Sequence, residues 1–183
     1  LITGATGFIG QHLVHRLRKP PAPGASEPTL ELRALARSTS DTSQLESLGV
    51  EIIEGDVTDW QAVVAAVDGC RRVVHLANVY SFWERDPSVY WRVNVEGTRR
   101  VALAAAEAGV ELFVHVSTVA VFGRPADVPF HEDSAPGVER FSDYAITKYE
   151  ADVVVGELAR THGLPVSFVY PASVLGPGDP KVS

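Results

Sequence analysis

Residues 3–10 read TGATGFIG, in which Gly4, Gly7 and Gly10 stand three positions apart. Glycine has no Cβ and lets the backbone take a positive φ, so regularly spaced glycines indicate a tight turn pressed against another group. The run stands almost at the start of the chain, whereas a first strand normally has about five residues. We therefore expect the natural N-terminus to lie upstream of residue 1.

A helix is predicted to begin inside this glycine run. In FIGQHLVHRL (8–17) the apolar residues recur at helical spacing and form one stripe. Residues 1–3 supply the end of a buried strand, so strand, glycine turn and helix N-terminus follow one another. The free amides and the dipole of a helix N-terminus attract a pyrophosphate. This order predicts a dinucleotide site, although glycine-rich turns also occur for purely structural reasons.

The composition narrows the class of protein. With 183 residues, 45% of them hydrophobic, the chain can bury one good core and fits one domain. No apolar run approaches the roughly 18 residues of a membrane span, and no signal peptide is visible. A net charge of −7 with interspersed acids and bases argues against a nucleic-acid surface. One cysteine, Cys70, excludes an internal disulfide and a multi-cysteine metal site, which indicates a reducing, cytoplasmic compartment.

Short apolar runs alternate with amphipathic stretches along the chain. Strands are predicted at 30–37, 49–55, 71–78, 111–118 and 165–172, and later helices at 58–69, 90–109 and 143–163. Such an alternation implies parallel crossovers. The expected fold is therefore α/β, a Rossmann-type doubly wound parallel sheet with helices on both faces. The Pro- and Gly-rich residues 19–28 read as an exposed loop.

The carboxyl ends of the strands are where a doubly wound sheet binds its ligand. Arg37 ends the second predicted strand and offers a charged plane to a 2′-phosphate, which favours NADP over NAD, unless it is an ordinary surface arginine. After the third strand, Asp56 could accept from an adenine amine while the amide of Val57 reaches a ring nitrogen. Alternatively, Asp56 caps the helix that follows.

The stretch YAITK places Tyr144 and Lys148 four residues apart, on one helix face. A phenol of pKa about 10 is a poor acid near neutrality, but a neighbouring ammonium lowers that pKa. Tyr144 is therefore predicted as a proton donor, with a plain helix-surface pair as the alternative. Thr118 or Ser117 could hold a carbonyl oxygen beside the phenol, and the amide of Asn94 could support a water next to the lysine.

Taken in chain order, the stretches TGATGFIG, GDVTD, HLAN, NVEGT, VSTVAVFG, YAITK and PASVLGPGD resemble an extended short-chain dehydrogenase/reductase of the NAD-dependent epimerase/dehydratase superfamily. LARSTS, FWERDPSVYWRVNVEGT and the Arg37 position look most like its dihydroflavonol-4-reductase-like branch. The resemblance implies one NAD(P)-binding Rossmann domain over residues 1–183. It also implies a smaller, mostly helical substrate-binding part beyond Ser183, absent from this sequence.

The resemblance assigns roles to single positions. The proton donor falls on Tyr144, the ribose-binding lysine on Lys148, the supporting amide on Asn94 and the hydroxyl on Thr118, with Ser117 as the fallback if the register is one off. No metal site is expected. Besides Tyr144 and Lys148, the implied cofactor-binding residues are Gly4, Thr6, Gly7, Phe8, Ile9, Gly10, Arg37, Asp56, Val57, Leu76, Ala77, Pro171, Ser173 and Val174.

Two departures from the family pattern bear on the substrate. Asn78 stands in HLAN where a second small residue is common, and Tyr170 stands where sugar-modifying relatives often carry arginine, which counts mildly against a nucleotide sugar. Four aromatic residues follow the fourth strand, where family substrate loops begin. They either line a pocket for a flat, apolar substrate or pack under the loop; they are Phe82, Trp83, Tyr90 and Trp91.

The leading hypothesis is an NAD(P)-dependent oxidoreductase, with NADP preferred and NAD possible, that moves hydride between nicotinamide and a ketone or secondary alcohol. One alternative is a nucleotide-sugar epimerase or dehydratase. A non-catalytic, cofactor-binding redox sensor is another, which the intact Tyr144–Lys148 pair disfavours. The expected partner is a small molecule, with neither nucleic acid nor membrane. The resemblance also makes a homodimer plausible, through the helices that hold Asn94 and Tyr144.

Overall fold

The computed structural model describes residues 1–19, 30–81, 83–126 and 128–179. In these residues the chain forms a six-stranded sheet of order β3-β2-β1-β4-β5-β6, in which every neighbouring pair is parallel. The order runs in both directions from β1, so the predicted doubly wound fold is confirmed. The strands are β1 (Ile2–Thr3), β2 (Arg33–Ala36), β3 (Glu51–Glu54), β4 (Arg72–His75), β5 (Leu112–Val116) and β6 (Val166–Val169).

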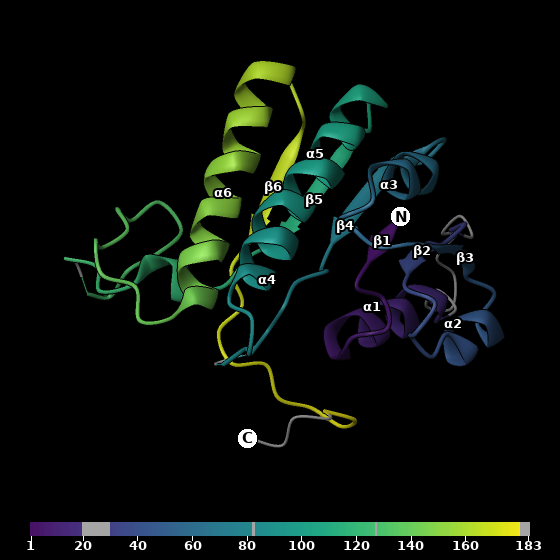
Figure 1. The fold of residues 1–183 in the computed structure, drawn as a ribbon, viewed down its shortest axis with the longest axis horizontal. Helices are drawn as coiled ribbons and strands as arrows, with labels where there is room; N and C mark the ends of the chain where they lie inside the picture. The colour runs from purple at the N-terminus through teal and green to yellow at the C-terminus, as the bar shows by residue number, and fades with distance from the viewer. Residues whose placement is uncertain (20–29, 82, 127, 180–183) are drawn as a thin grey trace, which may run out of the picture.

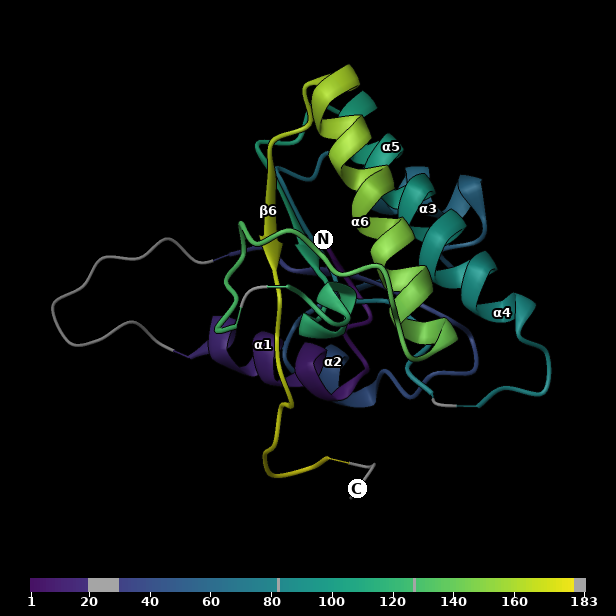
Figure 2. The ribbon, with the colours of Figure 1, turned by 90° about the vertical axis from the view of Figure 1, so that its left-hand side faces the viewer.

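Helices cover both faces of this sheet. Figure 1 shows α3, α5 and α6 side by side on one face and α1 and α2 on the other, and Figure 2 gives the same separation from the side. The helices are α1 (Phe8–Arg18), α2 (Ser43–Ser47), α3 (Trp60–Val67), α4 (Ser88–Tyr90), the π-helical η1 (Trp91–Gly97), α5 (Thr98–Glu107), the 3-10 turn η2 (Val119–Phe122) and α6 (Asp143–His162).

Each face of the sheet has its own apolar core. The larger cluster joins β4 and β5 to α3, α5 and α6, with Phe113, Val101 and Val155 fully buried. The smaller cluster packs Val14 of α1 and Leu45 of α2 against β1 and β2. Burial of apolar area is the dominant favourable contribution to folding, so these two clusters fix the strands whose ends carry the site.

The predicted helix at 90–109 is found, but it is not regular. Its first half is the π-helical η1, which continues α4 and runs into α5. Two short helices, α2 and η2, were not predicted, because five and four residues are too few to show a helical period. Among the described residues, no helix is long and apolar enough to cross a membrane.

The cap of α3 corrects one alternative. Asp59, not Asp56, is the N-cap: its carboxylate accepts from the amides of Gln61 at 2.9 Å and Ala62 at 3.3 Å. Asp56 instead accepts from the amide and the hydroxyl of Thr58, at 2.9 and 2.7 Å. This local turn sets the chain direction between β3 and α3, so the helix begins three residues later than a cap at Asp56 requires.

Candidate active site

The glycine turn is pressed against the chain that follows β4. Gly4 has a φ of 71°, and the Gly7 amide donates to the Gly4 carbonyl at 3.0 Å. A Cβ on Gly4 would lie 2.7 Å from the Ala77 nitrogen, and one on Gly10 would overlap the Gly4 carbonyl oxygen. Side chains are therefore excluded from this turn, which matches the close approach predicted for it.

The N-terminus of α1 fits an anionic ligand. Gly7 is its N-cap, and in the described part of the chain no side chain caps its first-turn amides. Unpartnered amides and the helix dipole favour negative charge at this point. The Thr6 carbonyl is held by Gln11 at 3.1 Å, while Phe8 stands half-buried against His12 and Ile9 is exposed.

The chain after β4 forms the other wall of the turn. Leu76 donates its amide to the Thr3 carbonyl at 3.1 Å, and Ala77 donates to the Thr3 hydroxyl at 3.2 Å. The side-chain amide of Asn78 donates to the Leu76 carbonyl at 2.8 Å. Its Oδ1 is buried and finds no partner among the described residues. A buried acceptor left unpaired is costly, so a donor from a bound dinucleotide suits this position.

Arg37 and Asp56 stand at the same edge of the sheet. Ala36 of β2 pairs with Glu54 of β3, so the residues that follow these two strands share one end of the sheet. Arg37 is exposed, and Asp56 is half-buried. Val57 is buried and packs where Gly97 has no side chain, since a Cβ there would lie 2.7 Å from Val57 Cγ2. The edge thus presents one cation and one carboxylate beyond the glycine turn.

The segment after β6 crosses from η2 to α1. At its start the Pro171 carbonyl accepts from the Val119 amide at 3.1 Å, and at its end the Pro177 carbonyl lies 3.0 Å from His12 Nε2. Ser173 and Val174, which lie between these anchors, are exposed. The structure therefore brings the predicted 171–174 stretch to the edge where the glycine turn also lies.

Tyr144 lies near Thr118, where α6 packs on η2. Burial raises the pKa of Tyr144 to about 12, and a hydrogen bond with the Thr118 hydroxyl offsets part of this rise. Thr118 is itself held as the N-cap of η2, where its oxygen accepts from the Ala120 amide at 3.2 Å. Tyr80 packs edge-on against the phenol, with ring centroids 5.2 Å apart. The phenol consequently keeps its proton at neutral pH.

The predicted lowering of the Tyr144 pKa by Lys148 is wrong for this structure. Burial of the phenol decides its pKa, and the lysine ammonium donates instead to the Val116 carbonyl at 2.9 Å. Burial also lowers the pKa of Lys148 to about 8, while the charge of Asp152 opposes this. Lys148 still lies one helical turn from Tyr144 on α6, as the spacing predicted.

Asn94 and Ser117 are both held by hydrogen bonds to neighbouring elements. Asn94 is buried in η1, where Oδ1 accepts from the Val79 amide at 2.7 Å and Nδ2 donates to the Thr147 hydroxyl at 3.1 Å. Its amide therefore ties the chain after β4 to α6. Ser117, the fallback for Thr118, points away from the phenol and donates to Asp152 at 2.9 Å.

Sequence reasoning missed a buried polar chain through His75. The Thr98 hydroxyl donates to the Asn94 carbonyl at 2.6 Å, so it accepts from His75 Nε2 at 2.9 Å. His75 Nδ1 then accepts from the Thr3 hydroxyl at 2.8 Å. Burial lowers the pKa of His75 well below its usual value, so this neutral ring connects β1, β4 and η1. In the sequence, the only indication of this buried chain was the place of His75 in the apolar β4 run.

His115 and Asp152 were also missed. Asp152 lies four residues beyond Lys148, the spacing that puts it on the same helix face, so this signal was present in the sequence. Its carboxylate meets His115 Nε2 at 2.9 Å, which depends on the packing of α6 on β5.

The aromatic residues after β4 divide between packing and exposure. Tyr90 is buried and donates to the Ser81 carbonyl at 3.0 Å, so it packs under the loop. Trp83 is 76% exposed and Trp91 is 48% exposed. Phe82 lies outside the described residues.

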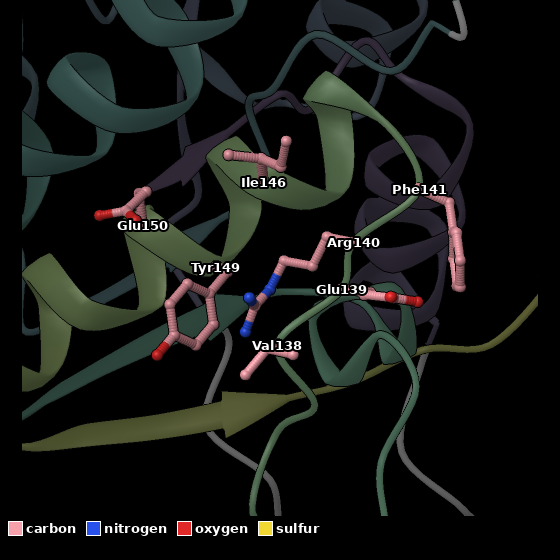
Figure 3. A pocket seen from close by; sticks show the side chains of 7 residues that line it. All are labelled: Val138, Glu139, Arg140, Phe141, Ile146, Tyr149 and Glu150. Carbon is pink, nitrogen blue, oxygen red and sulfur yellow. The ribbon is translucent and has the colours of Figure 1, made fainter.

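A separate hollow of about 510 Å³ opens at the start of α6 (Figure 3). Arg140 lies over the Tyr149 ring there, 3.4 Å from its centroid, and donates to the Val121 carbonyl at 3.0 Å. None of the predicted catalytic or cofactor-binding residues lines it. Its lining residues are Val138, Glu139, Arg140, Phe141, Ile146, Tyr149 and Glu150.

Comparison with known proteins decides the family. The family model described as "NAD dependent epimerase/dehydratase family" matches residues 1–183. The chain belongs to the NAD-dependent epimerase/dehydratase family. Its relatives include proteins named as reductases, dehydratases and epimerases.

Three proteins illustrate the relationship of this epimerase/dehydratase-family chain. A dihydroflavonol 4-reductase-like protein of Synechocystis sp. is 32% identical over 98% of this chain and 50% of its own length. The dTDP-glucose 4,6-dehydratase of Streptomyces antibioticus is 32% identical over 97% of this chain and 53% of its own. The Bordetella bronchiseptica enzyme WbmG, solved with NAD and UDP, superposes with a TM-score of 0.78 at 30% identity, over 96% of this chain and 53% of WbmG. The chain thus spans about half the length of these relatives.

Proposed function

We propose that the protein is an NADP-dependent oxidoreductase that exchanges hydride between nicotinamide and a ketone or secondary alcohol. The observation that carries this proposal is the packing of α6 on η2, which places Tyr144 beside Thr118, the N-cap of η2, with Lys148 one helical turn away. Two hydroxyls that face one point can hold a carbonyl oxygen and protonate it.

The pKa of Tyr144 suits a proton donor. At about 12 it keeps the phenol protonated near neutrality, and the alkoxide that develops on reduction is a much stronger base than the phenolate. When bound, a reduced nicotinamide supplies the hydride. Tyr144 then gives up its proton to the oxygen, and Thr118 orients that oxygen and stabilises its developing charge.

The preference for NADP rests on Arg37. Several structural relatives were solved with NAD, so a preference of this chain for NADP requires a local difference. An exposed guanidinium directly after β2 supports a 2′-phosphate, and the bidentate contact of arginine with phosphate is strong. Asp56 and Val57 would lie beside the adenine, and the Gly4–Gly10 turn beside the pyrophosphate.

A nucleotide-sugar dehydratase or epimerase is the second candidate, because a dTDP-glucose 4,6-dehydratase is among the relatives. Tyr170 weighs against it. Its ring packs on Phe168 and Phe122, with centroids 6.2 and 5.2 Å away, and supplies no positive charge for a diphosphate.

One experiment on the full-length protein separates the candidates. A panel of ketones is offered with NADPH, and the absorbance of the reduced nicotinamide is followed. A ketone-dependent loss of absorbance supports the proposal. Conversion of a nucleotide sugar without net change of cofactor contradicts it in favour of an epimerase or dehydratase. NADPH binding with neither reaction contradicts it in favour of a sensor.

We also propose that the protein forms a homodimer through η1 and α6. Trp91, Ile146 and Val153 expose 48, 36 and 48% of their surface there, and such side chains gain from being covered by a second copy. Sedimentation of the full-length protein is expected to give twice the monomer mass. The Val153→Glu variant is expected to sediment with the mass of a single monomer. A monomeric wild-type protein would contradict this.

A further inference from the structure

Two charged residues of α6 reach the same strand. Lys148 and Asp152 lie one turn apart, and between them they bind His115 and Val116 of β5 and Ser117, which directly follows this strand. The Val116 carbonyl accepts from the Lys148 ammonium, while His115 and the Ser117 hydroxyl each lie 2.9 Å from a different oxygen of the Asp152 carboxylate. The helix and the strand are thus joined by a lysine and a carboxylate side by side.

Little solvent reaches this cluster. Lys148 is 2% exposed, His115 is fully buried, and the Asp152 side chain is 12% exposed. A buried ammonium tends to lose its proton unless an anion is near. Among the described residues, Asp152 is the group whose negative charge acts to raise the pKa of Lys148.

The hydrogen bonds indicate an ionised Asp152. A carboxylate can accept from both neighbours at once, so Ser117 donates its hydroxyl proton and His115 donates from Nε2. His115 Nδ1 is then a bare nitrogen, and it is buried without a partner in the described part of the chain. Burial and the nearby lysine lower the pKa of His115 well below its usual value, so the ring is neutral.

We propose that Asp152 is a positioning residue of the active site, whose carboxylate, held by His115 and Ser117, keeps the neighbouring Lys148 ammonium charged and bound to β5. This inference rests on the proposed function, in which the charged Lys148 binds the cofactor ribose. Asp152 itself touches neither substrate nor cofactor.

The proposal gives a pH window. The pKa of Asp152 is raised to about 6, chiefly by burial, and that of Lys148 is lowered to about 8. Lys148 works in its protonated form, so its contribution is present below its pKa and lost as pH rises through it. Removing the Asp152 charge lowers that pKa further and moves the loss to lower pH.

Other titratable groups face the pair from each element packed around it. They are His75 of β4, His115 of β5, Tyr144 of α6, Arg140 before α6 and Tyr170 after β6. Both histidines are neutral, and both phenols keep their protons below about pH 12. Between pH 6 and 8, the lysine therefore has Asp152 as its titrating neighbour.

The test measures the Lys148 titration in the full-length protein labelled with ¹³C at the lysine ε-carbon. The Lys148 signal is assigned by its loss in Lys148→Met, and NADPH affinity is recorded over the same pH range. In Asp152→Asn, the pH midpoint of the Lys148 titration and the pH midpoint of the fall in NADPH affinity are both expected to shift down by about one pH unit or more. Asp152→Glu, which keeps the charge, is expected to restore them, and Glu157→Gln, an exposed carboxylate of the same helix, leaves them unchanged.

An unchanged Lys148 midpoint in a folded Asp152→Asn variant would overturn the role of Asp152. If that variant does not fold, the wild-type protein still decides: ¹⁵N NMR of His115 at pH 7 is expected to show the proton on Nε2, and a proton on Nδ1 would contradict the ionised carboxylate. Failure of the proposed function is recognised separately, because the wild-type protein would then oxidise no NADPH with any ketone, whatever its lysine titration shows.

Discussion

The glycine turn and the β5–α6 contact form the two halves of the candidate site in opposite ways. Around Gly4, the surface is made of backbone, and what matters is the absence of side chains: a Cβ on Gly4 or Gly10 would meet main-chain atoms. Around Lys148, the surface is made of buried side chains whose protons matter, with pKa values moved by burial.

This difference separates two kinds of sensitivity. A binding site built from close backbone approach is sensitive to added volume and tolerant of pH. A catalytic site built from buried titratable groups is sensitive to charge, and a change of one hydroxyl can leave binding intact. Substitutions in the two halves are therefore expected to change different measured constants.

The largest effect is expected for Tyr144→Phe. Loss of the proton donor should lower turnover by about 10²-fold or more, while NADPH affinity stays within roughly twofold. Turnover is measured with the best ketone, and affinity is measured by fluorescence titration. Tyr149→Phe is the matched control, since its ring lies under Arg140 and outside the site. A Tyr144→Phe variant that kept a tenth of the rate would remove Tyr144 from its role.

Arg37→Asp is expected to change binding instead. Replacing a bidentate cation with an anion should weaken NADPH binding by about 2 kcal/mol and improve NADH binding. The ratio of the two dissociation constants is the quantity to measure. The control is Arg72→Asp. Arg72 is an exposed arginine at the start of β4, and the candidate site lies at the other end of the strands. Equal losses for both cofactors would show that Arg37 does not recognise the 2′-phosphate.

Gly10→Ala tests the volume limit of the turn. The new Cβ overlaps the Gly4 carbonyl oxygen and Ala5, so the turn must shift. Forcing an extra methyl into a packed site costs about 1–3 kcal/mol, and we expect NADPH affinity to fall about tenfold. The check is a titration on protein shown to be folded by circular dichroism. Unaltered affinity would mean that the turn does not hold the dinucleotide.

The smallest effect is expected for Gly156→Ala. This substitution is the counterpart of Gly10→Ala in α6, the helix of the β5–α6 half of the site. Gly156 lies inside α6, and among the described residues no atom beyond the nearby backbone of the helix itself lies within 4 Å of a Cβ placed there. Alanine should therefore stabilise the helix by about 0.5–1 kcal/mol. Urea unfolding measures this difference. A loss of stability would show that α6 is constrained at this point by a contact absent from the structure.

Local patterns in the sequence were sufficient for the turn and for the Tyr144–Lys148 spacing. The Gly4–Gly10 run, the strand alternation and the four-residue step along a helix depend on neighbours in the chain, and all three are found. The cap of α3 shows the limit even of local reasoning, because Asp56 and Asp59 are both able to cap and the exit angle of β3 selects Asp59.

The rest depended on contacts between distant residues. Asp152 meets His115 and Ser117, which lie 37 and 35 positions away, so their cluster exists only once α6 has packed on β5. The sign of the Tyr144 pKa change was also beyond the sequence, since burial raises it while a nearby ammonium would lower it. Which effect is larger follows from depth in the fold.

The most direct test of the central claim follows one hydrogen atom. The full-length protein is given a reducible ketone and NADPH deuterated at nicotinamide C4, prepared separately on each face, and the product alcohol is analysed by mass spectrometry and NMR. The proposed reaction predicts one deuterium at the carbinol carbon from one of the two faces, and its loss with Tyr144→Phe. An alcohol without deuterium from either face, or a product formed with no oxidation of NADPH, would contradict it.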